Sequence, residues 1–209
     1  MQLLLDYTVF NEIQLDALRE IGNIGIGNAA TAMSQLLNKK IDITFPTVNL
    51  IQYEDIFEKS NAEQFVYAVI IRVLGDAPGN MLFIIEKQSL SNIVNTLCSN
   101  CGDEINEMGI SILGELGNII FTTYMNAIAK MTNLLLVPSV PAVTSDMMGA
   151  ILSTSFMESG QYGDYILDIE TQFVQENEKL NGHFYYIPMP GSLEKILKSL
   201  GLMEGNLNG

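Results

Sequence analysis

One pattern of four residues occurs twice in this chain, and every member of the second copy lies 95 residues after its counterpart. The two copies are Asp16, Glu20, Asn23 and Pro46, and then Ser111, Glu115, Asn118 and Pro141. In both copies 22 residues separate the asparagine from the proline. A four-point match at a constant offset indicates an internal repeat, so we expect the chain to fold as two similar units.

Hydrophobic periodicity gives both halves the same order of elements. In the first half we expect a long helix at 11–38, a strand at 40–52, a helical turn at 54–59, strands at 65–74 and 80–86, and a helix at 89–97. In the second half we expect a long helix at 104–132, a strand at 133–140, a helix at 147–154, strands at 165–174 and 183–187, and a helix at 192–200. The repeats therefore span about 10–98 and about 104–201 of one domain, 1–209.

This order of elements predicts an α+β fold. Each half alone would leave one sheet edge uncovered and its long helix half exposed. We therefore expect a single pseudo-two-fold domain in which the long helices pack against a shared, mainly antiparallel β-sheet and one core. Residues 79–83 parallel residues 182–186 at an offset of 103, which places the extra residues of the second half after Pro141.

Both long helices are predicted to carry a polar stripe. A helix turns by about 100° per residue, so with Asp16 at 0° Glu20 falls at about 40° and Asn23 at about −20°. The second stripe has the same spacing and consists of Ser111, Glu115 and Asn118. The opposite faces are apolar and consist of Leu18, Ile21, Gly25, Ala29 and Leu36, and of Leu113, Leu116, Ile120 and Tyr124. The stripes are therefore expected to point outward.

Gly22, Gly25 and Gly27 lie inside the first long helix, where each costs about 1 kcal/mol relative to alanine. We interpret them as positions where another backbone packs closely, such as that of the second long helix. A phosphate-binding loop would instead place its glycines at a helix start after a strand. Pro46 and Pro141 lack an amide donor and are expected at a strand edge, a bulge or a strand start.

The composition limits the possible partners. With 10 basic and 24 acidic side chains the net charge is −14, which argues against nucleic acid or an anionic membrane surface as the main partner. Basic or mixed protein surfaces fit better, and the alternative is that the acidity serves only solubility. The segment 110–129 contains a single charge, Glu115, but its polar residues and the lack of flanking belts favour a buried helix over a membrane span.

The thiols and the single histidine predict no metal centre. Cys98 and Cys101 form a lone Cys-x-x-Cys, and a zinc site would need two further soft ligands, whereas the only histidine is His183. We interpret the cysteines as structural or incidental thiols of a reducing compartment. Residues 1–6 are too short an apolar stretch, without a basic start, for a signal peptide, so we expect a cytoplasmic protein.

The doubled motif resembles the signature of the CheC-type chemotaxis phosphatases, a family that also includes CheX and FliY proteins. The similarity covers essentially the whole chain, and residues 18–25, LREIGNIG, are most similar to CheC members. The resemblance implies an enzyme that hydrolyses the aspartyl phosphate of the chemotaxis response regulator CheY. It further implies that the regulator supplies the phosphorylated aspartate and a divalent cation, Mg²⁺, so that the chain needs no cofactor of its own.

The resemblance also implies a role for each motif residue. Asn23 and Asn118 would orient the attacking water, and Glu20 and Glu115 would engage the regulator's lysine. The supporting positions would be Asp16, Pro46, Ser111 and Pro141. The chemistry agrees, because hydrolysis of an acyl phosphate mainly requires an in-line water and charge neutralisation, and a carboxamide can hold a water without titrating.

The resemblance implies the receptor deamidase CheD as a second partner, and we expect a monomer. Two alternatives remain open from the sequence. One is a non-catalytic adaptor that binds CheY or CheD, and the other is a phosphatase with one working site and one vestigial half. The sequence does not separate one site from two, because the resemblance accepts both aspartate and serine at the first position.

Overall fold

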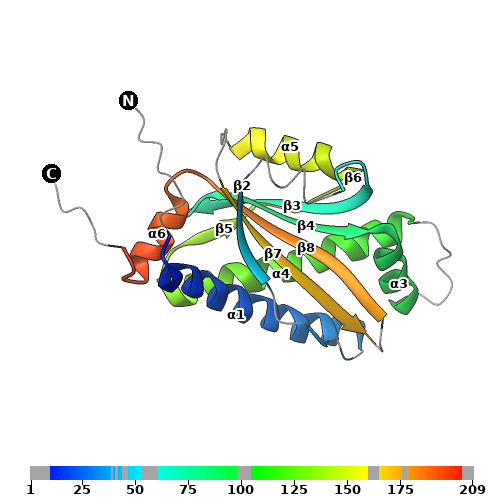
Figure 1. The fold of residues 1–209 in the computed structure, drawn as a ribbon. Coiled ribbons are helices and arrows are strands. Elements are labelled where there is room, and N and C mark those ends of the chain that lie inside the picture. Colours follow the sequence, from blue (N-terminus) through cyan, green and yellow to red (C-terminus); the bar gives the residue numbers. More distant parts are fainter. Residues whose placement is uncertain are drawn as a thin grey trace.

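In the computed structural model, residues 10–38, 40, 42–43, 47–52, 61–97, 105–159, 165–175 and 178–203 are described. They form an eight-stranded sheet with helices on both faces (Figure 1). The helices are α1 (Glu12–Leu37), α3 (Lys87–Leu97), α4 (Glu107–Thr132), α5 (Met148–Ser159) and α6 (Ser192–Ser199). The strands are β1 (Asp42–Ile43), β2 (Thr47–Gln52), β3 (Phe65–Gly75), β4 (Gly79–Glu86), β5 (Leu136–Pro138), β6 (Ala142–Met147), β7 (Tyr165–Gln175) and β8 (Glu178–Pro188).

The two halves exchange their first strands. The sheet has the order β1-β7-β8-β4-β3-β5, with β2 also paired to β7 and β6 also paired to β3, and every pair is antiparallel. Strands β1 and β2 of the first half therefore extend the second half's hairpin, and β5 and β6 of the second half extend the first half's hairpin. This arrangement confirms the predicted α+β fold with a shared antiparallel sheet.

A local two-fold axis passes through the centre of the sheet. Leu82 of β4 pairs with Tyr185 of β8, which is its own counterpart at the offset of 103 (185 − 82 = 103). A residue that pairs with its own repeat equivalent must lie at the symmetry axis. On either side the pairs Gly79↔Pro188 and Ile85↔Gly182 exchange equivalent ends of the two strands.

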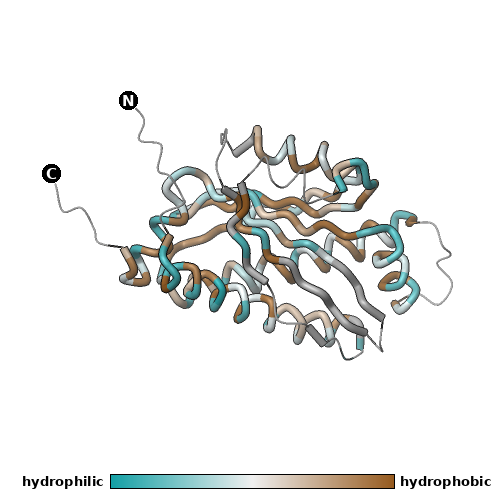
Figure 2. The backbone as a smooth tube through the Cα atoms, in the orientation of Figure 1, coloured by the Kyte–Doolittle hydropathy of each residue, from teal (hydrophilic) through white to brown (hydrophobic). Residues whose placement is uncertain are grey.

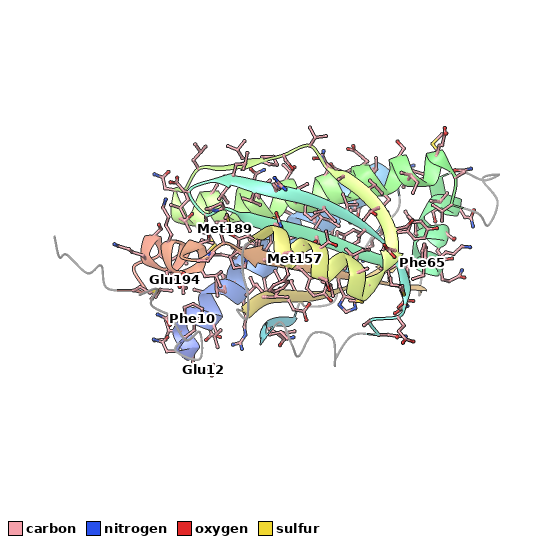
Figure 3. The ribbon with its side chains drawn as sticks, turned by 90° about the horizontal axis from the view of Figure 1, so that it is seen from above. Phe10, Glu12, Phe65, Met157, Met189 and Glu194 are labelled. Carbon is pink, nitrogen blue, oxygen red and sulfur yellow. The ribbon has the colours of Figure 1, made fainter. Side chains whose placement is uncertain are left out.

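The sheet divides the core into two clusters, where we expected one. Alternate residues of β4 face opposite sides, so Met81 and Phe83 join the cluster under α1 and α4, whereas Leu82 joins the cluster under α5. Figure 2 shows hydrophobic residues concentrated along β3 and β4. Figure 3 looks onto the face that α5 covers, with α1 and α4 beneath the sheet.

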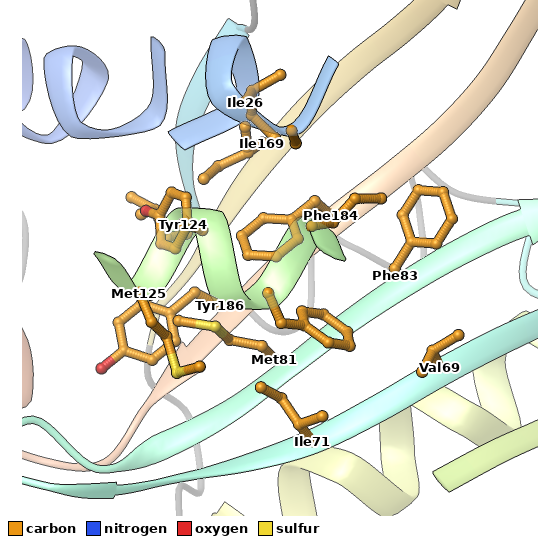
Figure 4. Close-up of a cluster of buried hydrophobic side chains, with 14 of the residues drawn as sticks. Ile26, Val69, Ile71, Met81, Phe83, Tyr124, Met125, Ile169, Phe184 and Tyr186 are labelled. Carbon is orange, nitrogen blue, oxygen red and sulfur yellow. The ribbon is translucent and has the colours of Figure 1, made fainter. Parts of the chain in front are cut away.

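Phe184 lies at the middle of the larger cluster (Figure 4). Its ring centroid is 4.7 Å from that of Tyr124 and 5.9 Å from that of Phe121, both on α4. Its backbone pairs with Phe83 of the first half. The side chain of Phe184 thus joins β8 and α4 of the second half, while its backbone pairs with β4 of the first half.

Asparagine residues set both ends of the two long helices. The side chain of Asn11 accepts a hydrogen bond from the Gln14 amide, and the Gln14 side chain accepts one from the Asn11 amide, which completes a capping box. The side chain of Asn106 likewise accepts from the amide of Gly109 and starts α4. The helices end at Asn38 and Asn133, with φ of 49° and 57°. Asparagine tolerates this left-handed conformation, so the helices stop there.

Several elements differ from the sequence-based expectations. Within the range 133–140, where one strand was expected, the structure has only the short β5, and β6, which follows it, was not predicted at all. Strand β8 begins at Glu178, five residues before the start expected at 183 (183 − 178 = 5). The helix expected at 147–154 exists as α5 and is longer. The expected turn at 54–59, together with Pro46, Cys98 and Cys101, lies outside the described residues.

The apolar faces of the long helices are buried as expected, with one exception. Leu18, Ile21 and Ala29 are buried, as are the predicted residues of α4. Leu36 is 39% exposed, so assigning it to the buried face was wrong. It lies in the last turn of α1, next to the cap at Asn38, where the chain leaves the helix.

The glycines of α1 have different roles. A Cβ atom at Gly25 would lie 2.8 Å from Cδ2 and 2.9 Å from Cα of Tyr124, so the predicted close packing of the two long helices occurs here. Gly27 is exposed, and a Cβ atom there would meet nothing within 4 Å. The interpretation of Gly27 as a packing residue was wrong, because its helix face points to solvent.

This difference predicts opposite effects of alanine at the two glycines. Gly27→Ala should raise the melting temperature by about 2–4 °C, because alanine favours a helix by about 1 kcal/mol and meets no obstacle. Gly25→Ala should lower it, because overpacking against the Tyr124 backbone costs about 1–3 kcal/mol and outweighs that gain. Thermal unfolding of both variants measures the difference, and equal stabilisation of the two would contradict the close contact between α1 and α4.

Candidate functional site

Both predicted stripes lie on the surface of the structure. Asp16, Glu20 and Asn23 are exposed on α1, and their counterparts are exposed on α4, namely Ser111, Glu115 and Asn118. Within the described part of the chain, the side chains of Glu20, Asn23, Glu115 and Asn118 form no hydrogen bond or ion pair with another residue. Their carboxylates and carboxamides are therefore available to a second molecule.

The first copy has an ion pair that the second copy lacks. Arg19 Nη1 lies 2.7 Å from Asp16 Oδ1 and 3.9 Å from Glu12 Oε2. The counterpart of Arg19 is Gly114 and that of Asp16 is Ser111, so a neutral pair replaces a charged one (19 + 95 = 114). With Arg19 counted, the first stripe carries the same formal charge as the second (−2 + 1 = −1), although their first residues differ. Sequence reasoning missed Arg19, and the signal that could have found it was its i+3 spacing from Asp16.

Small residues let the sheet support α4 directly behind Glu115. A Cβ atom at Gly117 would lie 2.7 Å from Cβ of Val69, and one at Gly114 would lie 3.4 Å from Cγ2 of Val143. Val143 belongs to β6 and pairs with Val69 of β3. The helix therefore rests on a platform of two strands, β3 and β6. The turn that carries Glu115 has its inner side against this platform, and Glu115 itself lies on the solvent side.

Pro141 lies immediately before the strand that carries Val143. It is half-buried and immediately precedes β6, so it marks a strand start, which is one of the three places expected for a residue without an amide donor. Strand β6 then carries Val143 beneath α4. The fixed spacing between asparagine and proline in the motif thus links the outward stripe to the strand that supports its helix.

The two stripes lie apart from each other. Helices α1 and α4 lie side by side and run in opposite directions (Figure 1), with Gly25 against Tyr124. From this contact and a rise of about 1.5 Å per residue, Glu20 and Glu115 are about 20 Å apart along the helix axes. The structure therefore presents two separate acid–amide sites rather than one composite site.

Two other kinds of site find no support in the described residues. No group of three or more His, Cys, Asp or Glu side chains converges there as a metal site would require. No described helix combines the length and the hydropathy needed to cross a membrane. His183 lies in β8, as expected, and its ring stacks on that of Tyr185 with centroids 6.0 Å apart.

Comparison with known proteins gives this geometry a family. The model of the CheC-like family matches residues 13–50 and 108–145, two segments displaced by 95 residues, each of which contains one whole motif. The CheY-P phosphatase CheC of Bacillus subtilis (strain 168) is 36% identical to the chain, over 93% of this chain and 98% of that protein. The flagellar motor switch phosphatase FliY of the same organism is 35% identical over 44% of this chain and 24% of that protein.

The fold is also found among solved structures. The crystal structure of FliY from Thermotoga maritima matches with a TM-score of 0.77 at 19% identity, and the match covers 92% of this chain and 98% of that chain. At this identity the match supports the fold alone. The repeated match to the family model and the near full-length similarity to Bacillus subtilis CheC establish the family, and the chain belongs to the CheC-like family.

Proposed function

We propose that this chain is a phosphatase that hydrolyses the aspartyl phosphate of phosphorylated CheY. The observation that carries the proposal is that both Glu–Asn pairs, Glu20 with Asn23 and Glu115 with Asn118, are exposed and have no internal hydrogen-bond partner among the described residues. A buried or internally bonded pair would serve the fold, whereas these pairs are free to contact another protein. The near full-length relative named a CheY-P phosphatase supports the same reaction.

In the proposed reaction a water oxygen attacks the phosphorus atom in line with its bond to the aspartate oxygen. That P–O bond breaks, and the products are inorganic phosphate and the free aspartate carboxylate of the regulator. Asn23 or Asn118 would orient the water, because a carboxamide both donates and accepts hydrogen bonds. Glu20 or Glu115 would pair with the regulator's lysine and so fix the position of the asparagine.

The protein would accelerate hydrolysis by positioning alone. The regulator would bring the phosphoryl group and its Mg²⁺ ion, which neutralises charge on the phosphoryl oxygens. Holding a water in the attacking position removes a large part of the entropic cost of the reaction. A rigid α4 helix, supported by Val69 and Val143, suits this task, because a loose support would not keep the asparagine and its water aligned with the phosphorus atom.

Turnover distinguishes this proposal from an adaptor. The chain is mixed with CheY at a molar ratio of about 1:50. A small-molecule phosphodonor and Mg²⁺ keep CheY phosphorylated, and the release of inorganic phosphate is measured over time. We expect many phosphates per chain above the intrinsic release by CheY. An adaptor that binds CheY or CheD would leave the intrinsic release unchanged, and that result would reject the phosphatase. The same assay with added CheD tests whether CheD, which we propose as a second partner, raises the rate.

A further inference from the structure

Each long helix exposes one large apolar side chain at the same repeat position. Ile13 of α1 is 66% exposed and Met108 of α4 is 55% exposed. The two positions are equivalents at the offset of the motif (108 − 13 = 95). A single exposed apolar side chain is ordinary on a protein surface. That general rule does not explain why an apolar side chain is exposed at both of two repeat-equivalent positions.

The exposure does not follow from the repeat alone. Leu36 is the other large apolar residue exposed on the described long helices, and its counterpart Met131 packs partly buried against the core (36 + 95 = 131). Surface exposure of an apolar residue therefore need not be shared between the halves. At Ile13 and Met108 it is shared.

Helix capping gives these residues no structural task. Both occupy the second position after the cap, whereas the capping hydrogen bonds go to the third position, at Gln14 and Gly109. The apolar residues just before the caps, Phe10 and Ile105, already pack against the core. A polar side chain would serve the helix start equally well at either of these second positions.

The exposed apolar residues align with the proposed catalytic stripes. Ile13 lies seven residues before Glu20, and Met108 lies seven residues before Glu115. Seven residues are close to two turns, so each pair lies on one side of its helix at a distance of about 10 Å. At the second copy the surface is also hollowed, in a shallow depression lined by Asn106, Glu107, Met108 and Ser111.

The antiparallel helices place these residues on the outer flanks. Because Gly25 faces Tyr124, Ile13 and Met108 are about 40 Å apart along the axes, roughly twice the separation of Glu20 and Glu115. A partner that touches both a stripe and its apolar residue therefore extends away from the other site. This placement favours one partner molecule at each end of the helix pair.

We infer that Ile13 and Met108 are apolar docking contacts for the phosphorylated response regulator, one at each site. This inference rests on the proposed function, since it assigns the same partner to the stripe and to the side chain beside it. The regulator must then carry an apolar recess about 10 Å from the lysine that Glu20 or Glu115 engages. Each chain should bind two regulators, with the apolar contact contributing affinity and the Glu–Asn pair contributing catalysis.

The test separates affinity from turnover. Binding of CheY loaded with beryllofluoride, a mimic of the acyl phosphate, is measured by titration calorimetry for wild type, Ile13→Gln, Met108→Gln and the double variant. We expect two regulators per wild-type chain and a loss of affinity of about tenfold at the altered site, as expected for removal of one buried apolar contact. The turnover number at saturating phosphorylated CheY should be retained while the KM rises. Leu135→Gln is the matched control, because Leu135 is also 66% exposed but lies outside the long helices.

The outcomes separate the inference from the function on which it rests. Unchanged affinity in the double variant, with wild-type turnover intact, would overturn the docking contact and leave the phosphatase. Weakened binding of the double variant, together with a wild type that shows no turnover, would support the docking contact and reject the phosphatase. A change in molecular mass by light scattering without a change in regulator affinity would show that these side chains join two copies of the chain, and would overturn the inference.

Discussion

Replacing Asn23 and Asn118 together with alanine should reduce the release of phosphate from phosphorylated CheY to the intrinsic rate of the regulator. Loss of a group that positions a reactant or stabilises a transition state typically lowers the rate by about 10²–10³-fold, and the double variant removes that group from both sites. The fold should be unaffected, because both side chains are exposed and have no hydrogen-bond partner among the described residues.

Matched asparagines provide the control for this result. Asn126 is exposed on α4 two turns beyond Asn118, and Asn28 is exposed on α1 away from the stripe. Asn28→Ala with Asn126→Ala therefore makes the same chemical change outside the motif. We expect this control to release phosphate at the wild-type rate. A comparable loss in the control would mean that the effect comes from the helix surface in general and not from the motif.

Phe184→Ala should destabilise the fold more than alanine at either Gly25 or Gly27. Phe184 is 1% exposed, and its removal leaves a cavity against Tyr124 and Phe121, which costs about 3–5 kcal/mol. For a chain of this size that cost corresponds to a fall in melting temperature of about 10 °C. Phe65→Ala is the matched control, because Phe65 is 53% exposed and its ring contacts only Tyr67 among the described rings.

The same experiment tests whether the chain is one domain. Phe184 lies at the junction of the halves, and each half supplies strands to the other half's hairpin. We therefore expect one cooperative transition in the wild type and one transition, shifted down, in Phe184→Ala. Two separate transitions, of which only the one from the second repeat shifts in Phe184→Ala, would show that the repeats about 10–98 and about 104–201 unfold independently.

The repeat made much of this fold predictable from the sequence. Because α1 and α4 have the same spacing of polar and apolar residues, the outward stripes and the shared sheet follow from one helical projection and from the uncovered edge of each half. Asn11 and Asn38 were expected at the ends of the first helix, and they cap it. Such features depend on local sequence, where periodicity and capping act directly.

The features that the sequence did not reveal depend on contacts between distant residues. Strand β6 has mostly exposed side chains and no apolar alternation, and its partner is β3 of the other half. The helical projection separates Gly25, on the apolar face, from Gly27, at about 20° on the polar side, so treating both as packing residues ignored this difference, and only Gly25 faces α4. The alignment of Ile13 with Glu20 was visible as a spacing of seven residues, but the exposure of Ile13 required the structure.

The lifetime of phosphorylated CheY tests the central claim most directly. CheY carrying a radiolabelled phosphoryl group is mixed with wild type, Asn23→Ala, Asn118→Ala or the double variant, and the decay of the label is followed. If both exposed Glu–Asn pairs act on the aspartyl phosphate, each single variant should give an intermediate lifetime and the double variant the intrinsic one. A double variant that shortens the lifetime as much as wild type would contradict the account.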